Sequence, residues 1–331
     1  MQQFKEHLKD APVFSKEVLK KISDENLWNI WVPKQFGGLE LSFMDGLKKL
    51  QSLARLDGSL GWTVTLCSGA NFFIGNLQPD VAQEIFKSPA ILGGSGGIFG
   101  TATKEGDSYK LNGIWRYATG APYLTHFTLN ARIVENGEEQ FNEDGTPKFL
   151  SFVIPADQVK VIEDWNTMGL KASATHSFEV NDVIADERYS FVYNKIHLPQ
   201  DIFKIHFSVF ADLTLWVNYV GMAEHYLEEA MKVARTEDYV QLKNVIAHAN
   251  EKINERAKEV ISLIEATGQF SDELISGVHH DAAISVKQLS AAIIGLHPLL
   301  GVKASREDHI LNQVFRDYFT GTQHHIFTKS E

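Results

Sequence analysis

The order of helical and strand-like segments is the feature that most constrains the fold of this chain. Residues 1–90 carry apolar side chains at helical spacing, residues 91–195 form short alternating runs broken by Gly, Asn-Gly and Asp, and residues 196–331 return to helical spacing. Periods of 3.6 and 2 distinguish amphipathic helices from half-buried strands. We therefore expect an α+β protein with an N-terminal α-helical domain, a middle β domain and a C-terminal four-helix bundle at these boundaries.

The C-terminal region contains four successive apolar stripes, each repeating every three or four residues. They begin at Leu213, Ile246, Ala282 and Ile310. Four long amphipathic helices in succession are typical of an up-and-down bundle. In the N-terminal region, residues 14–32 predict a first helix and residues 44–56 a second, before a third that begins in LDGSLGW and a short fourth in PDVAQEIFK.

The middle region contains the most informative stretch, GDSYKLNGIWRYATGAPYLTHFTLNARI at residues 106–133. Residues alternate on both sides of Asn112-Gly113, which predicts a hairpin with a two-residue turn at this dipeptide. Further short predicted strands follow, and the sequence between them has no helical spacing of apolar residues. Such spacing predicts an antiparallel barrel or sandwich. It leaves open whether Thr119-Gly120, at the end of the second predicted strand, is only a bend or also a binding site.

Charge and cysteine content exclude several classes of function. The net charge of -11 over 331 residues argues against a broad nucleic-acid surface, which requires a basic face. The single cysteine, Cys67, makes neither an intrachain disulfide nor a cysteine zinc site. The histidine pairs 279–280 and 324–325 lack the i, i+4 spacing of a helical zinc site, so we expect no metal.

We find no secretory h-region and no apolar run of about 18 residues, and we expect a soluble, cytoplasmic protein without a membrane partner.

The glycine-rich segment Gly93–Gly97 satisfies Gly-x-Ser-x-Gly, the nucleophile elbow of serine hydrolases. That motif must lie between a strand and a helix, whereas the sequence that follows it here predicts a strand and a turn. The same glycines fail the dinucleotide-binding pattern, because Phe99 stands in place of the third glycine. We interpret the segment as a flexible loop next to a binding site, with Ser95, Gly96 and Gly97 facing a ligand.

Five stretches of text, in order, resemble the acyl-CoA dehydrogenase superfamily along nearly the whole chain. They are LWNIWVPKQFGGLELS, LARLDGSLGW, GDSYKLNGIWRYATGA, WNTMGLKASATHSFEVNDVIADERYSF and VFRDYFTGTQHH. The Asp-Gly-Ser-x-x-Trp and Trp-x-x-x-Thr-Gly patterns look most similar to the branch of flavin-dependent monooxygenases that use reduced flavin delivered by a reductase. The Thr-Glu-x-x-x-Gly-Ser-Asp segment of true acyl-CoA dehydrogenases is missing from the sequence.

The resemblance implies a flavin, FAD or FMN, between the β domain and the C-terminal bundle. Thr119 falls where the superfamily places a hydroxyl beside the flavin ring, with Gly120 next to it, and Tyr117 falls where it places an aromatic wall. An isoalloxazine ring needs such a hydrogen-bonding group and such a face. A second wall and backbone contacts are implied for four further residues: Trp165, Gly169, Leu170 and Ser173. Each of these residues also has a plain structural reading as strand, turn or core.

The bundle-helix Glu that abstracts a proton in acyl-CoA dehydrogenases has no counterpart after Arg316-Asp317, which we interpret as a structural ion pair. His324 or His325 stands there instead, where the monooxygenase branch has a histidine acting as acid or base. These histidines could equally be exposed residues near the C-terminus. Arg235 is the nearest match to the superfamily's arginine that grips the FAD pyrophosphate across a subunit interface.

Three functions remain open from the sequence. The first is a flavin-dependent oxidoreductase that acts in a monooxygenase-like mode on a small organic substrate, with a flavin reductase as partner. The second is a true acyl-CoA dehydrogenase with a non-standard base. The third is a degenerate homologue that binds a ligand or partner without redox chemistry. The resemblance further implies a homotetramer or homodimer.

Overall fold

The computed structural model describes residue 4, residues 6–8, residues 10–266 and residues 268–327. Its N-terminal helices are α2 (Lys16–Asp24), α3 (Phe43–Leu56), α4 (Gly58–Asn71) and α5 (Pro79–Ile85). Side chains of Ser15, Ser42 and Asp57 cap three of them by accepting a backbone N–H from the first turn. The first helix is shorter than predicted: it ends at Asp24, and only a short 3-10 turn follows over Leu27–Asn29.

The middle of the chain forms one eight-stranded sheet in the order β6-β7-β2-β1-β3-β5-β8, with β4 paired to β3. The strands are β1 (Leu92–Glu105), β2 (Ser108–Ala118), β3 (His126–Glu135), β4 (Glu138–Glu139), β5 (Phe149–Pro155), β6 (Lys160–Ile162), β7 (His176–Asp186) and β8 (Ser190–Phe191).

The predicted antiparallel arrangement is wrong in one central place, because β1 and β3 pair in parallel. The reason is topological. The hairpin places β2 on one edge of β1, so β3 takes the opposite edge and runs in the same direction as β1. The sheet is therefore mixed.

The predicted turn at Asn112-Gly113 is also wrong. The hairpin turns at Gly106 and Asp107, between β1 and β2, and Asn112 and Gly113 lie inside β2. There the pairing of β2 with β7 shifts register between Leu111 and Gly113, and Gly113 has a φ of 154°. Alternation on both sides of this dipeptide thus marks an irregularity within one strand.

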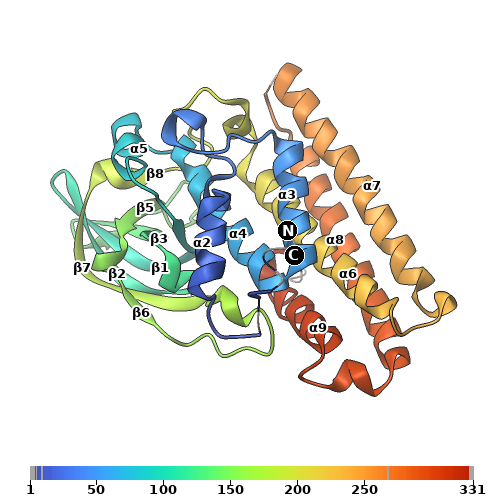
Figure 1. Cartoon of the computed structure of the whole chain (residues 1–331). Coiled ribbons are helices and arrows are strands. Elements are labelled where there is room, and N and C mark those ends of the chain that lie inside the picture. The colour runs from blue at the N-terminus through green and yellow to red at the C-terminus, as the bar shows by residue number, and fades with distance from the viewer. Residues whose placement is uncertain (1–3, 5, 9, 267, 328–331) are drawn as a thin grey trace.

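The C-terminal region contains the four long helices expected from the apolar stripes. They are α6 (Phe207–Ala230), α7 (Thr236–Ala266), α8 (Asp272–Leu296) and α9 (Ile310–Gly321). Helix α4 packs against both β1 and α6, so it lies between the sheet and the C-terminal helices (Figure 1). Trp216 and Leu213 of α6 are fully buried in the core that these helices share.

Short 3-10 helices complete the secondary structure of the described residues. They are Leu27–Asn29, Lys34–Phe36, Phe72–Gly75, Ala121–Tyr123, Ala156–Gln158, Lys171–Ser173, Glu187–Tyr189, Asp201–Lys204, His297–Leu300, Val302–Ser305 and His325–Phe327. The segment Asp272–Leu300 is long and apolar enough to cross a membrane by length and composition alone, with a mean hydropathy of 1.3. Core helices of globular proteins reach the same values.

Candidate functional site

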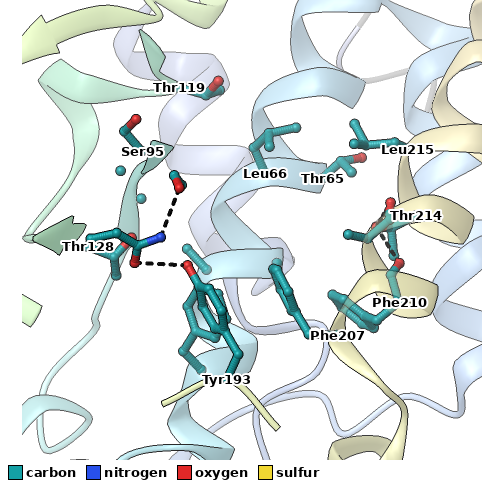
Figure 2. Close-up of a pocket in the computed structure, with 18 of the residues that line it drawn as sticks. Thr65, Leu66, Ser95, Thr119, Thr128, Tyr193, Phe207, Phe210, Thr214 and Leu215 are labelled. Atoms are coloured by element: carbon teal, nitrogen blue, oxygen red, sulfur yellow. Dashed lines mark hydrogen bonds between the residues drawn. The ribbon is translucent and has the colours of Figure 1, made fainter. Parts of the chain in front are cut away.

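A cavity of about 160 Å³, here called the inner cavity, lies where the sheet meets α4 and α6. Ser95, Thr119 and Thr128 border it on the sheet side, and Leu66 and Leu215 border it on the helix side (Figure 2). Its full lining is Thr65, Leu66, Gly69, Ala70, Phe73, Gly93, Gly94, Ser95, Gly96, Thr119, Thr128, Leu129, Asn130, Tyr193, Phe207, Phe210, Ala211, Thr214 and Leu215.

The glycine-rich segment is part of a strand rather than the predicted loop. It lies in β1, where the parallel pairing with β3 shifts register between Ser95 and Ile98. Gly94 allows the two strands to approach, since a Cβ atom there would lie 1.8 Å from the carbonyl oxygen of Thr128. Ser95 and Gly96 line the inner cavity, whereas Gly97 does not. The register shift within β1, and not a loop, therefore brings Ser95 to the wall of the inner cavity.

A second cavity of about 290 Å³, here called the outer cavity, opens beside the ends of β2 and β7. Tyr117 and Trp165, the two predicted aromatic walls of the flavin, both line it, together with Ile114, Arg116, Ile162, Asp164, Thr175 and Ser177. The Tyr117 side chain is 62% exposed and its φ is 69°, at a register shift between Trp115 and Ala118. A left-handed backbone at a bulky residue is strained and is frequent at functional sites.

A chain of hydroxyl groups joins the two cavities. The Thr119 hydroxyl lies 3.1 Å from that of Thr175, which lies 2.8 Å from that of Ser173. Thr119 lines the inner cavity and Thr175 lines the outer one. The N–H of Gly120 donates to the Ser173 carbonyl at 2.8 Å, and Gly120 has a φ of 76°. The dipeptide Thr119-Gly120 is thus a bend, and it also places a buried hydroxyl between two cavities.

The segment that carries Trp165 is docked onto α9. The Trp165 indole N–H donates to the Leu170 carbonyl at 3.0 Å, and the Leu170 N–H donates to the Asp317 carboxylate at 2.6 Å. Gly169 permits this contact, because a Cβ atom there would lie 2.3 Å from the backbone of Arg316. Gly169 and Leu170 therefore position the segment and do not themselves line either cavity.

Arg316 and Asp317 do not form the structural ion pair predicted for them. Arg316 pairs with Asp10 at 2.8 Å, whereas Asp317 is buried. Burial, and then the nearby carboxylate of Asp57, raise the pKa of Asp317 to about 8. Burial likewise raises the pKa of Asp57 to about 6. The two aspartates are therefore a buried acidic pair beside the docked segment.

His324 follows the end of α9 and lies edge-on against Trp62, with ring centroids 5.8 Å apart. Trp62 lies one helical turn before Leu66 on α4, and neither Trp62 nor His324 is among the residues that line the inner cavity. Its backbone N–H and the Tyr219 hydroxyl donate to the same carbonyl, that of Gly321, at 3.0 and 2.7 Å. His325 begins the 3-10 helix His325–Phe327, and its side chain falls outside the described part of the structure.

Arg235 lies in the connection between α6 and α7 and lines neither cavity. Its guanidinium is exposed and pairs with Glu237 at 3.4 Å and with Asp238 at 3.3 Å. Of the predicted site residues, Ser95, Gly96 and Thr119 line the inner cavity and Tyr117 and Trp165 line the outer one.

Sequence reasoning missed Thr175, Asn130 and Tyr193. Thr175 stands two residues after Ser173, but neither lies in a strand, so strand alternation gives no signal for the contact between their hydroxyls. Asn130 and Tyr193 have no local signal. Their side chains meet across 63 residues of sequence, where the Tyr193 hydroxyl donates to the Asn130 Oδ1 at 3.1 Å.

Comparisons with known proteins agree with the motifs. No protein-family model matches the chain. It is 27% identical over 223 residues to an indole-3-acetate monooxygenase from Acinetobacter baumannii, a match that covers 66% of this chain and 56% of that relative. It is 21% identical over 338 residues to the flavin-dependent monooxygenase oxygenase subunit HsaA from Mycobacterium tuberculosis, covering 93% of this chain and 84% of the relative.

Among solved structures, the chain is similar to XiaF from Streptomyces sp. in complex with FADH2 and glycerol. The TM-score is 0.88 at 19% identity, with 98% of this chain and 89% of that chain covered. The resemblance inferred from the motifs is confirmed: this chain has the acyl-CoA dehydrogenase-like fold, and its relatives include an indole-3-acetate monooxygenase and the oxygenase subunit of a flavin-dependent monooxygenase.

Proposed function

We propose that this chain is the oxygenase component of a two-component flavin-dependent monooxygenase. It takes a reduced flavin, FAD or FMN, from a flavin reductase and holds a small organic substrate in the inner cavity. The hydrogen bond between Thr119 and Thr175 carries this proposal, because it connects a cavity with two aromatic walls to a separate ligand-sized cavity.

The outer cavity fits a flavin ring. Tyr117 and Trp165 offer aromatic faces, and the strained, exposed Tyr117 is costly to maintain without a ligand. Arg116 adds a cationic group to the same lining, suited to an anionic reduced ring or a phosphate. Bound there, a reduced flavin would supply the electrons needed for one atom of dioxygen to be inserted into the substrate and the other to leave as water.

The residues of the chain bind, orient and shield the reactants. The Thr119 hydroxyl is buried and held by Thr175, so it presents a fixed hydrogen-bonding group between flavin and substrate. Aromatic side chains of the inner cavity exclude water from the substrate. His324, or His325 in its place, holds and moves a proton at an imidazole nitrogen, and Tyr219 fixes the turn that carries them.

Oxidation of an acyl thioester is not proposed. The Thr-Glu-x-x-x-Gly-Ser-Asp segment of acyl-CoA dehydrogenases is missing from the sequence, and the relatives are named as monooxygenases and hydroxylases. By analogy with the superfamily, we propose a cytoplasmic homotetramer or homodimer, in which Arg235 reaches the flavin pyrophosphate of a neighbouring subunit.

Flavin binding tests the proposal. Visible absorption would be recorded while oxidised FAD or FMN is added, and ultrafiltration under anaerobic conditions would measure binding of the chemically reduced forms. We expect micromolar or tighter binding of at least one reduced flavin. Failure to bind either flavin in either redox state would refute the oxygenase function and leave the degenerate ligand-binding homologue.

Tyr117→Ala gives the site-specific form of this test. Loss of one stacked aromatic face removes about 1 to 1.5 kcal/mol, so we expect reduced flavin to bind about tenfold more weakly. Tyr239→Ala is the matched control, because Tyr239 is half-buried on α7 and lines neither cavity. Equal affinities of the two variants would place the flavin elsewhere.

A further inference from the structure

The inner cavity is lined by apolar, hydroxyl and amide groups. Among the described residues that line it, none is Asp, Glu, Lys, Arg or His. Arg132, the next residue on this face of β3 after Asn130, is not part of the lining. Its Nη1 pairs with Glu139 at 3.1 Å, and its Nε is buried without a hydrogen-bond partner. A negatively charged group in this cavity would therefore lose hydration without gaining a cationic partner.

Aromatic rings form one wall of the inner cavity. Tyr193 and Phe207 are stacked with centroids 4.8 Å apart and planes at 11°, and Phe73 lies 5.3 Å from Tyr193. Figure 2 shows Tyr193, Phe207 and Phe210 along the same side of the cavity. Flat rings favour a flat aromatic guest. The volume of about 160 Å³ is close to the roughly 150 Å³ of a protein cavity that takes up benzene.

The polar groups of the wall are mostly bonded to the wall itself. The Asn130 Nδ2 donates to the Gly96 carbonyl at 2.8 Å, and its Oδ1 accepts from the Tyr193 hydroxyl at 3.1 Å. Ser95 differs, because its hydroxyl accepts a backbone N–H at the long distance of 3.4 Å and can still donate its own proton. The cavity thus offers an aromatic guest hydrogen-bonding groups at Ser95 and at the Thr119 hydroxyl, and Thr128 adds a further hydroxyl to the lining.

From these observations we infer that, among aromatic compounds, the inner cavity accepts uncharged ones and discriminates against aryl carboxylates. The inference rests on the proposed function, since it names the substrate class of the same site. It separates this chain from its relative named for indole-3-acetate, because a carboxylic acid is ionised at neutral pH.

Calorimetric titration with three compounds tests the inference. Indole, indole-3-acetamide and indole-3-acetate would be titrated at neutral pH into the flavin-free protein and into the protein holding reduced flavin without oxygen. The amide and the acid match in size and differ in charge. We expect indole and the amide to bind, and the acid to bind at least tenfold more weakly than the amide. An acid that binds as tightly as the amide overturns the inference.

Leu66→Lys shows whether the compounds occupy this cavity. Leu66 is half-buried on α4 and lines the cavity, so a lysine there supplies the missing cation. We expect the preference for the amide over the acid to fall at least tenfold. Leu299→Lys is the matched control, because Leu299 is 57% exposed and lies outside the lining. An unchanged preference in folded Leu66→Lys, checked by circular dichroism, contradicts the inference.

The flavin titration keeps the two proposals apart. If the protein binds flavin but none of the three compounds, the substrate inference is refuted and the proposed oxygenase function is retained. If the protein binds the uncharged compounds selectively but does not bind flavin, the inference about the cavity is supported and the proposed oxygenase function is refuted.

Discussion

Asp317 is a buried carboxyl group whose ionisation opposes folding. It accepts the Leu170 N–H, and burial together with Asp57 raises its pKa from 3.8 to about 8. Between about pH 4 and pH 8, the folded state therefore holds a proton that the unfolded state has already released. Stability falls as pH rises through this window and levels off above it. The contribution is unfavourable at high pH, opposite to that of a salt-bridged carboxylate.

Replacing this group with a neutral isostere should remove the pH dependence. Asp317→Asn keeps an acceptor for the Leu170 N–H and carries no charge, so its stability relative to the native chain should rise steadily from pH 5 to pH 8. Urea unfolding at several pH values measures the difference. Asp24→Asn serves as the control, because Asp24 is exposed on α2. A difference that stays constant with pH would show that Asp317 is already ionised in the folded protein.

The contact between α3 and α6 depends on a glycine. A Cβ atom at Gly221 of α6 would lie 2.4 Å from the Gln51 carbonyl oxygen and 2.8 Å from the Ala54 Cβ. We expect Gly221→Ala to lower the free energy of unfolding by about 1 to 3 kcal/mol, because both helices must move apart. Gly295→Ala on α8 is the control: no atom lies within 4 Å of its Cβ, and helix propensity should stabilise it by up to about 1 kcal/mol. Thermal unfolding distinguishes them, and equal shifts would refute the close contact.

Elements with local signals could be predicted from the sequence, and those set by long-range pairing could not. Helices α6 to α9 follow from apolar stripes such as the one through Leu213 and Trp216. The parallel pairing of β1 with β3 could not be predicted, because strand neighbours depend on the whole topology. The same difference holds at the site: Thr119 lies in a quoted motif, whereas its partner Thr175 becomes a neighbour only after β2 and β7 pair.

At the scale of the whole molecule, one carboxylate connects the three parts of the chain. Asp10 near the N-terminus accepts hydrogen bonds from Lys171 of the middle region at 3.0 Å and from Arg316 of α9 at 2.8 Å. Burial alone would raise the pKa of Asp10, but these hydrogen bonds outweigh it and lower the pKa below its usual value. The ionised Asp10 carboxylate therefore stabilises the folded protein at pH values above its unfolded pKa. This stabilisation is lost as the pH falls through its folded pKa. Since Lys171 and Arg316 flank the docked segment between Trp165 and α9, this cluster also supports the outer cavity.

Asp10→Ala should therefore weaken both folding and the flavin site. The Asp10 side chain is 25% exposed, so we expect a loss of about 1 to 2 kcal/mol in the free energy of unfolding at neutral pH. This loss should shrink as the pH falls below 3.8, because the carboxylate of the native chain then becomes protonated. Asp201→Ala is the control, because Asp201 pairs with Lys204 within one exposed turn and bridges no separate parts. Urea unfolding measures the stability, and the flavin titration at pH 7 measures the site. A stability loss with unchanged flavin affinity would show that the segment carrying Trp165 is held by the Leu170–Asp317 contact without help from Asp10.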